Sequence, residues 1–370
     1  MFISSLHLTN FRNHSNIALD FELGNNVIVG RNGLGKTNIV EAIHYCATLS
    51  SHRVSNDLPL IRHDHNEALI NAAFGKHSRR ASLEIAIRAS GTNSGSLNGN
   101  SMPKVRDVLG LVHAVIFSPE DLDLVRGEPA IRRAFLDEFC LQLRPAFAGL
   151  RLDYEKALRQ RNSLLKSLGR RTPTGDALAT LEAWDEQLVT LGALLIHSRI
   201  HGLHELSPYV IEHGQMISGD QEPLVATYCA KWVEEMPMEL PEIQSELRRA
   251  LEENRGNEID RGQTVVGPHR DDIELKLNHM PAKGYASHGQ SWSISLALKL
   301  AMFSSLRQVD DDPILILDDV FAELDATRRT RLESALTNVE QIIVTVADSD
   351  DIPEQLKGNY VNLSDVMSNA

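Results

Sequence analysis

The residues of this chain best suited to chemistry form a glycine-rich run that ends in a lysine and a threonine, Gly30-Arg-Asn-Gly-Leu-Gly-Lys-Thr37. An apolar stretch at 27–29 precedes the run and a segment of helical character, 37–49, follows it. In a strand–loop–helix setting, glycines let successive backbone N–H groups point at phosphate oxygens, and a helix N-terminus favours anions. A chance glycine-rich turn before a helix is the alternative interpretation. The Lys–Thr pair and the setting favour a site for a nucleoside triphosphate, ATP.

The side chains of this loop have separate expected roles. Lys36 would reach the β- and γ-phosphates, and Thr37 would offer its hydroxyl to Mg²⁺. We expect the nucleotide to contact Gly30, Arg31, Asn32, Gly33, Leu34, Gly35, Lys36 and Thr37.

A magnesium–nucleotide site also needs a carboxylate from a neighbouring strand. The apolar run 314–317 is followed by Asp318 and Asp319. We expect Asp318 to serve the metal, and Asp319 to orient or deprotonate the attacking water. Two aspartates after an apolar strand can also be a solvated strand end. The distant P-loop and the following 320–325 run favour a Walker B site.

A third short pattern, Ser287-His-Gly-Gln290, precedes a strongly helical segment, 293–307. Alone it is typical of an ordinary helix N-cap. In ABC-type ATPases an S-x-G-Q turn binds the γ-phosphate held by the other subunit, where the helix dipole favours an anion. Its position before the Walker B strand favours this role for Ser287, Gly289 and Gln290. A complete site would then require two chains, arranged head to tail as a homodimer.

The bulk composition limits the class of protein. The chain has 370 residues, 42% of them apolar, which is enough for two or three domains. The N-terminal residues do not resemble a targeting leader, and no apolar stretch is long enough to span a bilayer. Three isolated cysteines give neither a disulfide framework nor a zinc pair. We therefore expect a cytoplasmic protein with reduced cysteines and no membrane partner.

The formal net charge of −13 argues, by itself, against nucleic acid as a partner. The charge is unevenly distributed, because 144–171 holds eight basic and two acidic residues, whereas 173–260 holds five basic and seventeen acidic ones. A solvated charged face is one interpretation of the basic segment. A stripe that follows nucleic-acid phosphates is the other. Five cations fall on one helical arc: Arg144, Arg151, Arg159, Lys166 and Arg170.

Patterns along the chain indicate two regions. The pair Asn98-Gly99 indicates a hairpin turn, and apolar residues recur at helical spacing from about 129 onward. Strand patterns occupy 2–8, 27–29, 83–88, 273–277, 314–317 and 342–346. The simplest topology is an α/β domain made from both ends of the chain, with a helical domain inserted at about 127–260.

Taken together, these features resemble the RecF family of bacterial SMC-like ATPases over nearly the whole chain. The 117–129 and 132–137 runs are long and not generic to ABC proteins, which makes the match specific. The resemblance rests on Leu8-Thr-Asn-Phe-Arg-Asn13, the P-loop, Ser51-His-Arg53, 117–129, 132–137, Tyr154 with 157–162, Gly267-Pro-His-Arg-Asp271, and 317–325.

The fold implied by the resemblance is an ABC-type P-loop ATPase head, a mixed sheet with helices. It would be built from 1–126 and 261–370, with an inserted all-helical arm domain at 127–260. The insert has no sustained heptads and no Cys-x-x-Cys hook, which agrees with a short arm. The resemblance also implies that Arg12 approaches the nucleotide phosphates and that Asn32 contacts the γ-phosphate.

The function implied by the resemblance is ATP-dependent DNA binding in recombinational repair and replication restart. ATP-clasped dimers would bind DNA at single-strand gaps or at junctions of duplex and single strand, with RecR and RecO as partners. Together they would load recombinase onto single-stranded DNA, as part of the SOS response. The chain would be a slow DNA-dependent ATPase, and hydrolysis of ATP would release the DNA. Our candidate DNA contacts are Arg151, Arg159 and Lys166 on the arm, with Arg79, Arg80 and Arg328 on the head.

The chain also departs from related ATPases. Asp319 stands where many carry a glutamate, so we expect turnover of a few per minute or less, well below the roughly 10 s⁻¹ of typical enzymes. No histidine follows the 342–346 strand, and Trp292 occupies a position that is often basic. His269 and Arg270 are either catalytic or part of a structural turn that joins head and arm, and we favour the turn.

Two other classes of function stay open on the sequence. The nucleotide-binding subunit of an ABC transporter is disfavoured by the long insert between the motifs and by the absence of a clear Leu-Ser-Gly-Gly-Gln. A structural adaptor, in which ATP only holds the dimer together, would show no hydrolysis above the background of a Lys36→Ala variant.

Overall fold

The computed structural model places the chain in two compact units. The first comprises 1–122, 209–223 and 287–370, and the second comprises 123–208 and 224–286. The residues that the structure describes are 1–76, 79–169, 174–218, 223–309, 312–322, 324–348 and 352–368.

The first unit contains a six-stranded antiparallel sheet with the strand order β2-β1-β4-β5-β6-β7. Its strands are β1 (Phe2–Phe11), β2 (His14–Asp20), β4 (Glu67–Lys76), β5 (Arg79–Arg88), β6 (Ser94–Leu97) and β7 (Asn100–Ser101). Asn98 and Gly99 form the two-residue turn between β6 and β7, both with positive φ (51° and 77°), as the predicted hairpin requires.

A second, parallel sheet in the same unit carries the strands that precede the predicted site. Its order is β14-β3-β13-β12-β8, and every neighbouring pair is parallel. Its strands are β3 (Gly24–Val29), β8 (Ala114–Phe117), β12 (Ile314–Asp318), β13 (Gln341–Val346) and β14 (Asn359–Asn362). Every residue of β12 and β13 is buried, because both faces of this sheet are covered. Continuous apolar runs are the pattern expected of such strands.

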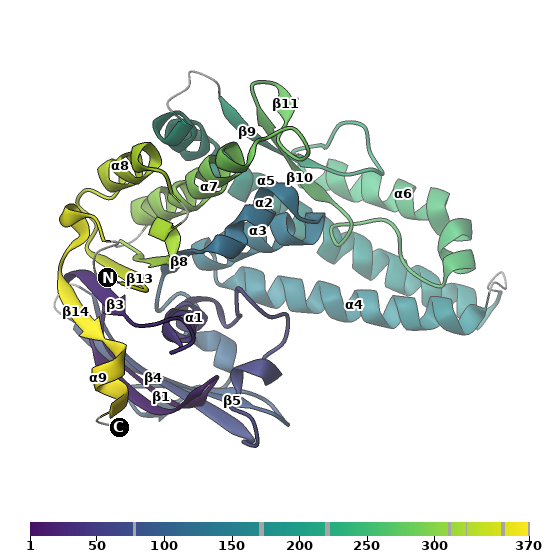
Figure 1. Ribbon diagram of the computed structural model, residues 1–370. Helices are drawn as coiled ribbons and strands as arrows, with labels where there is room; N and C mark the ends of the chain where they lie inside the picture. Colours follow the sequence, from purple (N-terminus) through teal and green to yellow (C-terminus); the bar gives the residue numbers. More distant parts are fainter. Residues whose placement is uncertain are drawn as a thin grey trace. The chain divides into compact units, whose positions relative to one another are not determined.

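Helix α1 (Lys36–Thr48) lies between the two sheets of the first unit (Figure 1). Residues of α1, of the antiparallel strands and of β8 and β12 share one buried hydrophobic core. The remaining helices that lie wholly in this unit are α7 (His288–Val309), α8 (Ala326–Ala335) and α9 (Leu363–Ser368). The core therefore fixes α1 against the strand ends from which the nucleotide motifs emerge.

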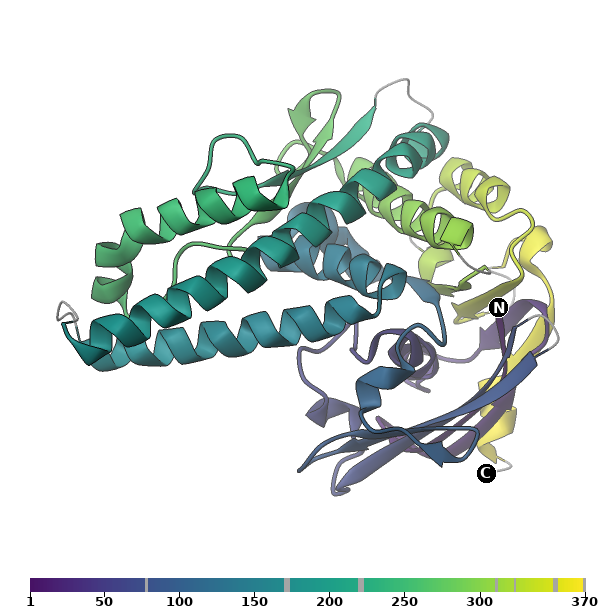
Figure 2. The same ribbon diagram turned by 180° about the vertical axis from the view of Figure 1, so that it is seen from behind.

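The second unit is mainly helical. Three of its long helices, α4 (Ala146–Leu168), α5 (Asp176–Ser218) and α6 (Leu240–Arg261), pack together around Leu165, Leu181 and Ile259 (Figure 2). Its helices are α2 (Asp123–Arg126), α3 (Pro129–Leu143), α4 (Ala146–Leu168), α5 (Asp176–Ser218, which continues into the first unit) and α6 (Leu240–Arg261). A three-stranded antiparallel sheet completes the unit: β9 (Leu224–Cys229), β10 (Asp272–Leu277) and β11 (Met280–Pro281).

The insert agrees with the sequence-based prediction in its mainly helical character, but its composition and bounds differ, and 209–223, predicted to belong to the arm, lies in the first unit. The insert is not all-helical, because β9 lies inside the predicted 127–260 arm and pairs with β10. The 261–286 segment, predicted to belong to the head, lies in the second unit for the same reason. Among the described residues, no helix combines the length and the apolarity that a bilayer crossing requires.

Candidate nucleotide site

The backbone of the predicted P-loop has the conformation that phosphate binding needs. Gly33 and Gly35 have φ of +87° and +99°. A Cβ at Gly35 would lie 2.5 Å from side-chain atoms of Asn13 and His14, so only glycine fits there. Helix α1 begins immediately afterwards at Lys36, with no side-chain cap and no acidic residue in its first turn. The first N–H groups of α1 are therefore available to an anion.

Lys36 is almost fully buried at this loop. Its Nζ donates to the Gly30 carbonyl oxygen at 2.8 Å and lies 3.3 Å from the side-chain oxygen of Asn32. Both partners belong to the loop and are neutral. The cation is thus held where the loop backbone would receive phosphate, and the residues present fit a nucleotide.

Thr37 and Asp318 meet, as the two halves of a Walker site must. The Thr37 hydroxyl donates to Asp318 Oδ1 at 3.2 Å, and the Thr345 hydroxyl of β13 donates to the same oxygen. Burial, reinforced by the negative charges of Asp319 and Glu120, raises the pKa of Asp318 to about 6, while the two hydroxyl groups act in the opposite direction. Hydroxyl and carboxylate oxygens are the ligands that Mg²⁺ prefers.

Asp319 adopts a left-handed backbone conformation, with φ of +50°. Aspartate tolerates this region better than most residues. Its N–H group lies 3.0 Å from the Thr345 hydroxyl oxygen and 3.3 Å from the Thr345 carbonyl oxygen. Thr345 therefore orders both aspartates. Sequence reasoning missed Thr345, although a single hydroxyl within the apolar β13 run was a usable signal.

The predicted S-x-G-Q turn is a reciprocal capping box at the start of α7. The Ser287 N–H donates to the Gln290 side-chain oxygen at 2.9 Å, and the Gln290 N–H donates to the Ser287 hydroxyl at 3.2 Å. Both side chains are exposed. The N-cap interpretation is thus correct for the local geometry. In this box the Ser287 hydroxyl oxygen only accepts a hydrogen bond. Its O–H group can therefore still donate to an anion.

Arg328, which the sequence predicts to contact DNA, lies over this turn. A Cβ at Gly289 would come within 2.2 Å of Arg328 Nη2. The guanidinium also pairs with Asp325 at 2.7 Å and donates to the Ser293 hydroxyl at 3.3 Å. The close approach of Arg328 therefore depends on glycine at 289, and it brings the Arg328–Asp325 ion pair to the turn.

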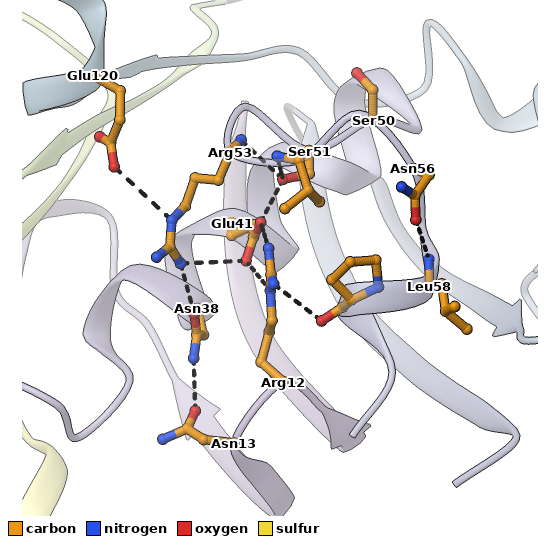
Figure 3. Close-up of polar contacts among 12 residues, drawn as sticks. Arg12, Asn13, Asn38, Glu41, Ser50, Ser51, Arg53, Asn56, Leu58 and Glu120 are labelled. Carbon is orange, nitrogen blue, oxygen red and sulfur yellow. Dashed lines mark hydrogen bonds and ion pairs between the residues drawn. The ribbon is translucent and has the colours of Figure 1, made fainter. Parts of the chain in front are cut away.

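Arg12 is engaged by a buried carboxylate that belongs to α1 (Figure 3). Its guanidinium makes two hydrogen bonds to the carboxylate of Glu41 and one to the Pro59 carbonyl oxygen. Arg53 lies on the other side of Glu41, 3.8 Å from it, and donates to Asn38 at 3.0 Å. Glu41 is fully buried and lies one helical turn after Thr37. Two arginines thus share one carboxylate next to the P-loop, which sequence reasoning did not anticipate.

The residues of the arm that are predicted to contact DNA differ in whether a carboxylate lies near them. Arg151 and Arg159 both lie near the carboxylate of Glu155, at 3.5 and 4.0 Å. Lys166 is exposed, as is Arg80 on β5. Arg170 and the side chain of Arg79 lie outside the part of the chain that the structure describes.

Trp292 and His269, which the sequence analysis also considered, are both held by contacts within the protein. Trp292 is buried and packs edge-on against Phe117, with ring centroids 5.2 Å apart. His269 is hydrogen-bonded to Tyr154 and to the Thr264 carbonyl oxygen within the second unit. These contacts agree with the structural-turn interpretation of 267–271.

Comparisons with known proteins agree with this architecture. The family model described as RecF/RecN/SMC N terminal domain matches residues 2–361. The chain is 42% identical over 391 residues to a DNA replication and repair protein RecF of Renibacterium salmoninarum, covering 98% of each chain. It is 44% identical to the RecF of Kineococcus radiotolerans, over 100% of this chain and 99% of that one.

Solved structures with a similar fold also include RecF proteins. A structure of the recombination mediator protein RecF-ATPrS in the RecFOR pathway has a TM-score of 0.86 and 29% identity, covering 98% of this chain and 96% of that chain. An SmcHead structure, with a TM-score of 0.50 and 16% identity, covering 94% of this chain and 90% of that chain, shares the fold. The chain therefore belongs to the RecF family of the RecF/RecN/SMC group.

Proposed function

We propose that the chain is an ATP-dependent DNA-binding protein of recombinational repair and replication restart. The observation that carries the proposal is the hydrogen bond between Thr37 of the P-loop and Asp318 of the Walker B strand. It joins a phosphate-binding loop to a carboxylate suited to Mg²⁺. Solved RecF structures described as RecF-ATP and RecF-ATPrS, at 30% and 29% identity, support ATP as the nucleotide.

The nucleotide would be held by the P-loop, from Gly30 to Thr37. When bound, Mg²⁺ would be held by Thr37 and Asp318 and would neutralise phosphate charge. Asp319, ordered by Thr345, is the residue that we propose orients the attacking water. Its side chain is one methylene shorter than that of glutamate, so we propose that hydrolysis is slow. We further propose that hydrolysis acts as a switch and depends on DNA.

A second chain would complete the site. Ser287, Gly289 and Gln290 form a turn at a helix N-terminus with exposed Ser287 and Gln290 side chains, and the guanidinium of Arg328, paired with Asp325, lies against it. We propose that this turn binds the γ-phosphate held by the partner chain, so that ATP induces a head-to-tail dimer. We propose this contact for Arg328 in addition to the DNA contact predicted from the sequence.

The dimer would clamp DNA at single-strand gaps or at junctions of duplex and single strand, and hydrolysis would release it. As a cytoplasmic member of the RecF family, it would help RecO and RecR to load recombinase during the SOS response. The solved relatives' description as recombination mediators in the RecFOR pathway supports these partners.

The test is the affinity of the full chain for a duplex with a single-stranded overhang, at fixed salt, with ATP and with ADP. We expect tighter binding with ATP, and loss of that difference in Lys36→Ala. Lys104→Ala, which removes an exposed head lysine, is the charge-matched control and should behave like wild type. Equal affinity with the two nucleotides in the wild-type protein would refute the nucleotide-gated clamp.

A further inference from the structure

The Gly267-Pro-His-Arg-Asp-Asp272 turn of the second unit is fixed by a buried hydrogen-bond network. The Thr264 carbonyl oxygen can only accept, so His269 Nε2 carries the proton and donates to it at 3.2 Å. His269 Nδ1 then accepts from the Tyr154 hydroxyl at 2.7 Å. Burial lowers the pKa of His269 to about 4, so the ring is neutral at pH 7. A Cβ at Gly267 would lie 2.9 Å from the same hydroxyl, at a φ of +119°.

The two aspartates of the turn also face the protein. Asp271 is 1% exposed and accepts hydrogen bonds from the Tyr228 hydroxyl and from the Trp232 indole nitrogen, both at 2.7 Å. Asp272 forms a two-fold ion pair with Arg132, with both N–O distances 2.8 Å. The side chains that follow Arg270 are therefore already held by partners in the second unit.

Arg270 is the exception in this turn. It is exposed, and within the described residues its guanidinium has neither a hydrogen bond nor an ion pair. It lines a cavity of about 630 Å³ together with two further exposed cations, Lys231 and Arg261, which likewise lack partners in the described part of the chain. The only carboxylate among the described lining residues is Asp272, which Arg132 neutralises. The cavity is thus strongly cationic in an otherwise acidic protein.

The cavity also has an aromatic wall. Trp232 lines it, half-buried, and its indole N–H is fixed by Asp271. Rigid aromatic faces beside cations are the combination by which proteins hold unpaired bases and their phosphates. A concave space of this volume is within the range that small-molecule sites occupy, so it suits a nucleotide that has left the duplex. The smooth outer surface of a duplex would not enter it.

We propose that this cavity binds the backbone phosphates of single-stranded DNA, with Arg270 as the central contact and Trp232 as a stacking face for a base. Arg261 and Lys231 flank the strand. The inference rests on the proposed function, because it assigns the single-strand contact of that activity to particular residues. It differs from the stripe predicted on α4, where Arg151 and Arg159 lie beside Glu155.

The experiment measures binding of a fluorescein-labelled oligothymidine to the full chain with ATP, as a function of salt. Each lost phosphate contact lowers the slope of log affinity against log salt by about 0.7 for single strands. We expect Arg261→Ala/Arg270→Ala to lower the slope by between about 1 and 2. The double variant Arg248→Ala/Arg249→Ala is the control, because it removes equal charge from exposed but ion-paired arginines of α6. It should leave the slope unchanged.

A second measurement avoids dependence on affinity alone. Quenching of tryptophan fluorescence by the same oligonucleotide should disappear in Trp232→Phe, and Arg270→Lys should restore most of the affinity lost in Arg270→Ala. If the wild-type chain binds the oligonucleotide and the slope of Arg261→Ala/Arg270→Ala is unchanged, the cavity assignment is overturned and the proposed function stands. If the wild-type chain binds no DNA with ATP, both are overturned.

Discussion

Replacing Thr345 with valine tests whether the hydroxyl of β13 sets the charge of the metal-binding carboxylate. Valine has almost the shape of threonine, so the change at this fully buried position removes the hydroxyl without opening a cavity. The change removes a hydrogen bond donated to Asp318 and one accepted from the Asp319 N–H. Only the Thr37 hydroxyl would then still donate to Asp318 among the partners described.

The expected magnitude follows from the contacts. A hydrogen bond to an ionised group contributes about 1.5–3 kcal/mol, and one pKa unit corresponds to about 1.4 kcal/mol. The Asp318 pKa, about 6 in the wild-type chain, should therefore rise by about 1 to 2 units in Thr345→Val. Mg²⁺ binds the ionised carboxylate, so protonation competes with the metal as the pH falls through the folded-state pKa. At pH 7 the variant should lose about two- to tenfold in Mg²⁺-dependent ATP affinity.

The assay is Mg²⁺-dependent binding of a fluorescent ATP analogue across a pH series. The nucleotide titrates identically against every variant, so differences between midpoints report on the protein. Thr345→Ser keeps the hydroxyl and should keep the wild-type midpoint. Asp318→Asn should remove the protein's contribution to the pH dependence. A Thr345→Val midpoint that coincides with the wild-type midpoint would refute the reasoning.

Two further substitutions test the dimer and the stability of the second unit. Gly289→Ala would place a methyl group against Arg328, so we expect loss of ATP-induced dimerisation in light scattering, with ATP binding by the monomer intact; a normal dimer would contradict the assignment of the turn. Arg161→Met would leave Glu258 without its buried ion-pair partner and Asp185 with Arg255 alone, and it should destabilise the chain by about 3–5 kcal/mol, measured by calorimetry against an Arg248→Met control. A melting curve equal to that of the control would show that the buried cluster contributes little.

Features encoded over short distances could be predicted from the sequence. The P-loop and the hairpin at Asn98-Gly99 depend on glycines with positive φ, and their sequence spacing reveals them. The buried strands β12 and β13 were visible as apolar runs because a parallel sheet covered on both faces needs no polar side. In these cases the physical requirement and the sequence signal involve the same few residues.

Side-chain partners from distant segments could not be predicted in this way. Arg161 falls in the basic segment, yet it is fully buried between Asp185 and Glu258. Helical spacing gives the direction of a side chain on α4, but it does not reveal which helix packs there. For the same reason the contact of Arg328 with Gly289 was missed, since it joins the start of α7 to α8 across about forty residues of sequence.

Sequence alone also does not show which charged side chains are paired with one another in the fold. Net charge is therefore a poor guide to DNA binding by an acidic chain. Affinity for a polyanion comes from cations that displace counterions from phosphate, and an arginine already beside a carboxylate contributes less. The net charge of −13 counts every carboxylate equally. Yet Asp271 and Asp272 are bound inside the second unit, where they hold the turn that presents Arg270. Acidic residues of this kind do not oppose DNA binding; they fix the position of the cation that makes the contact.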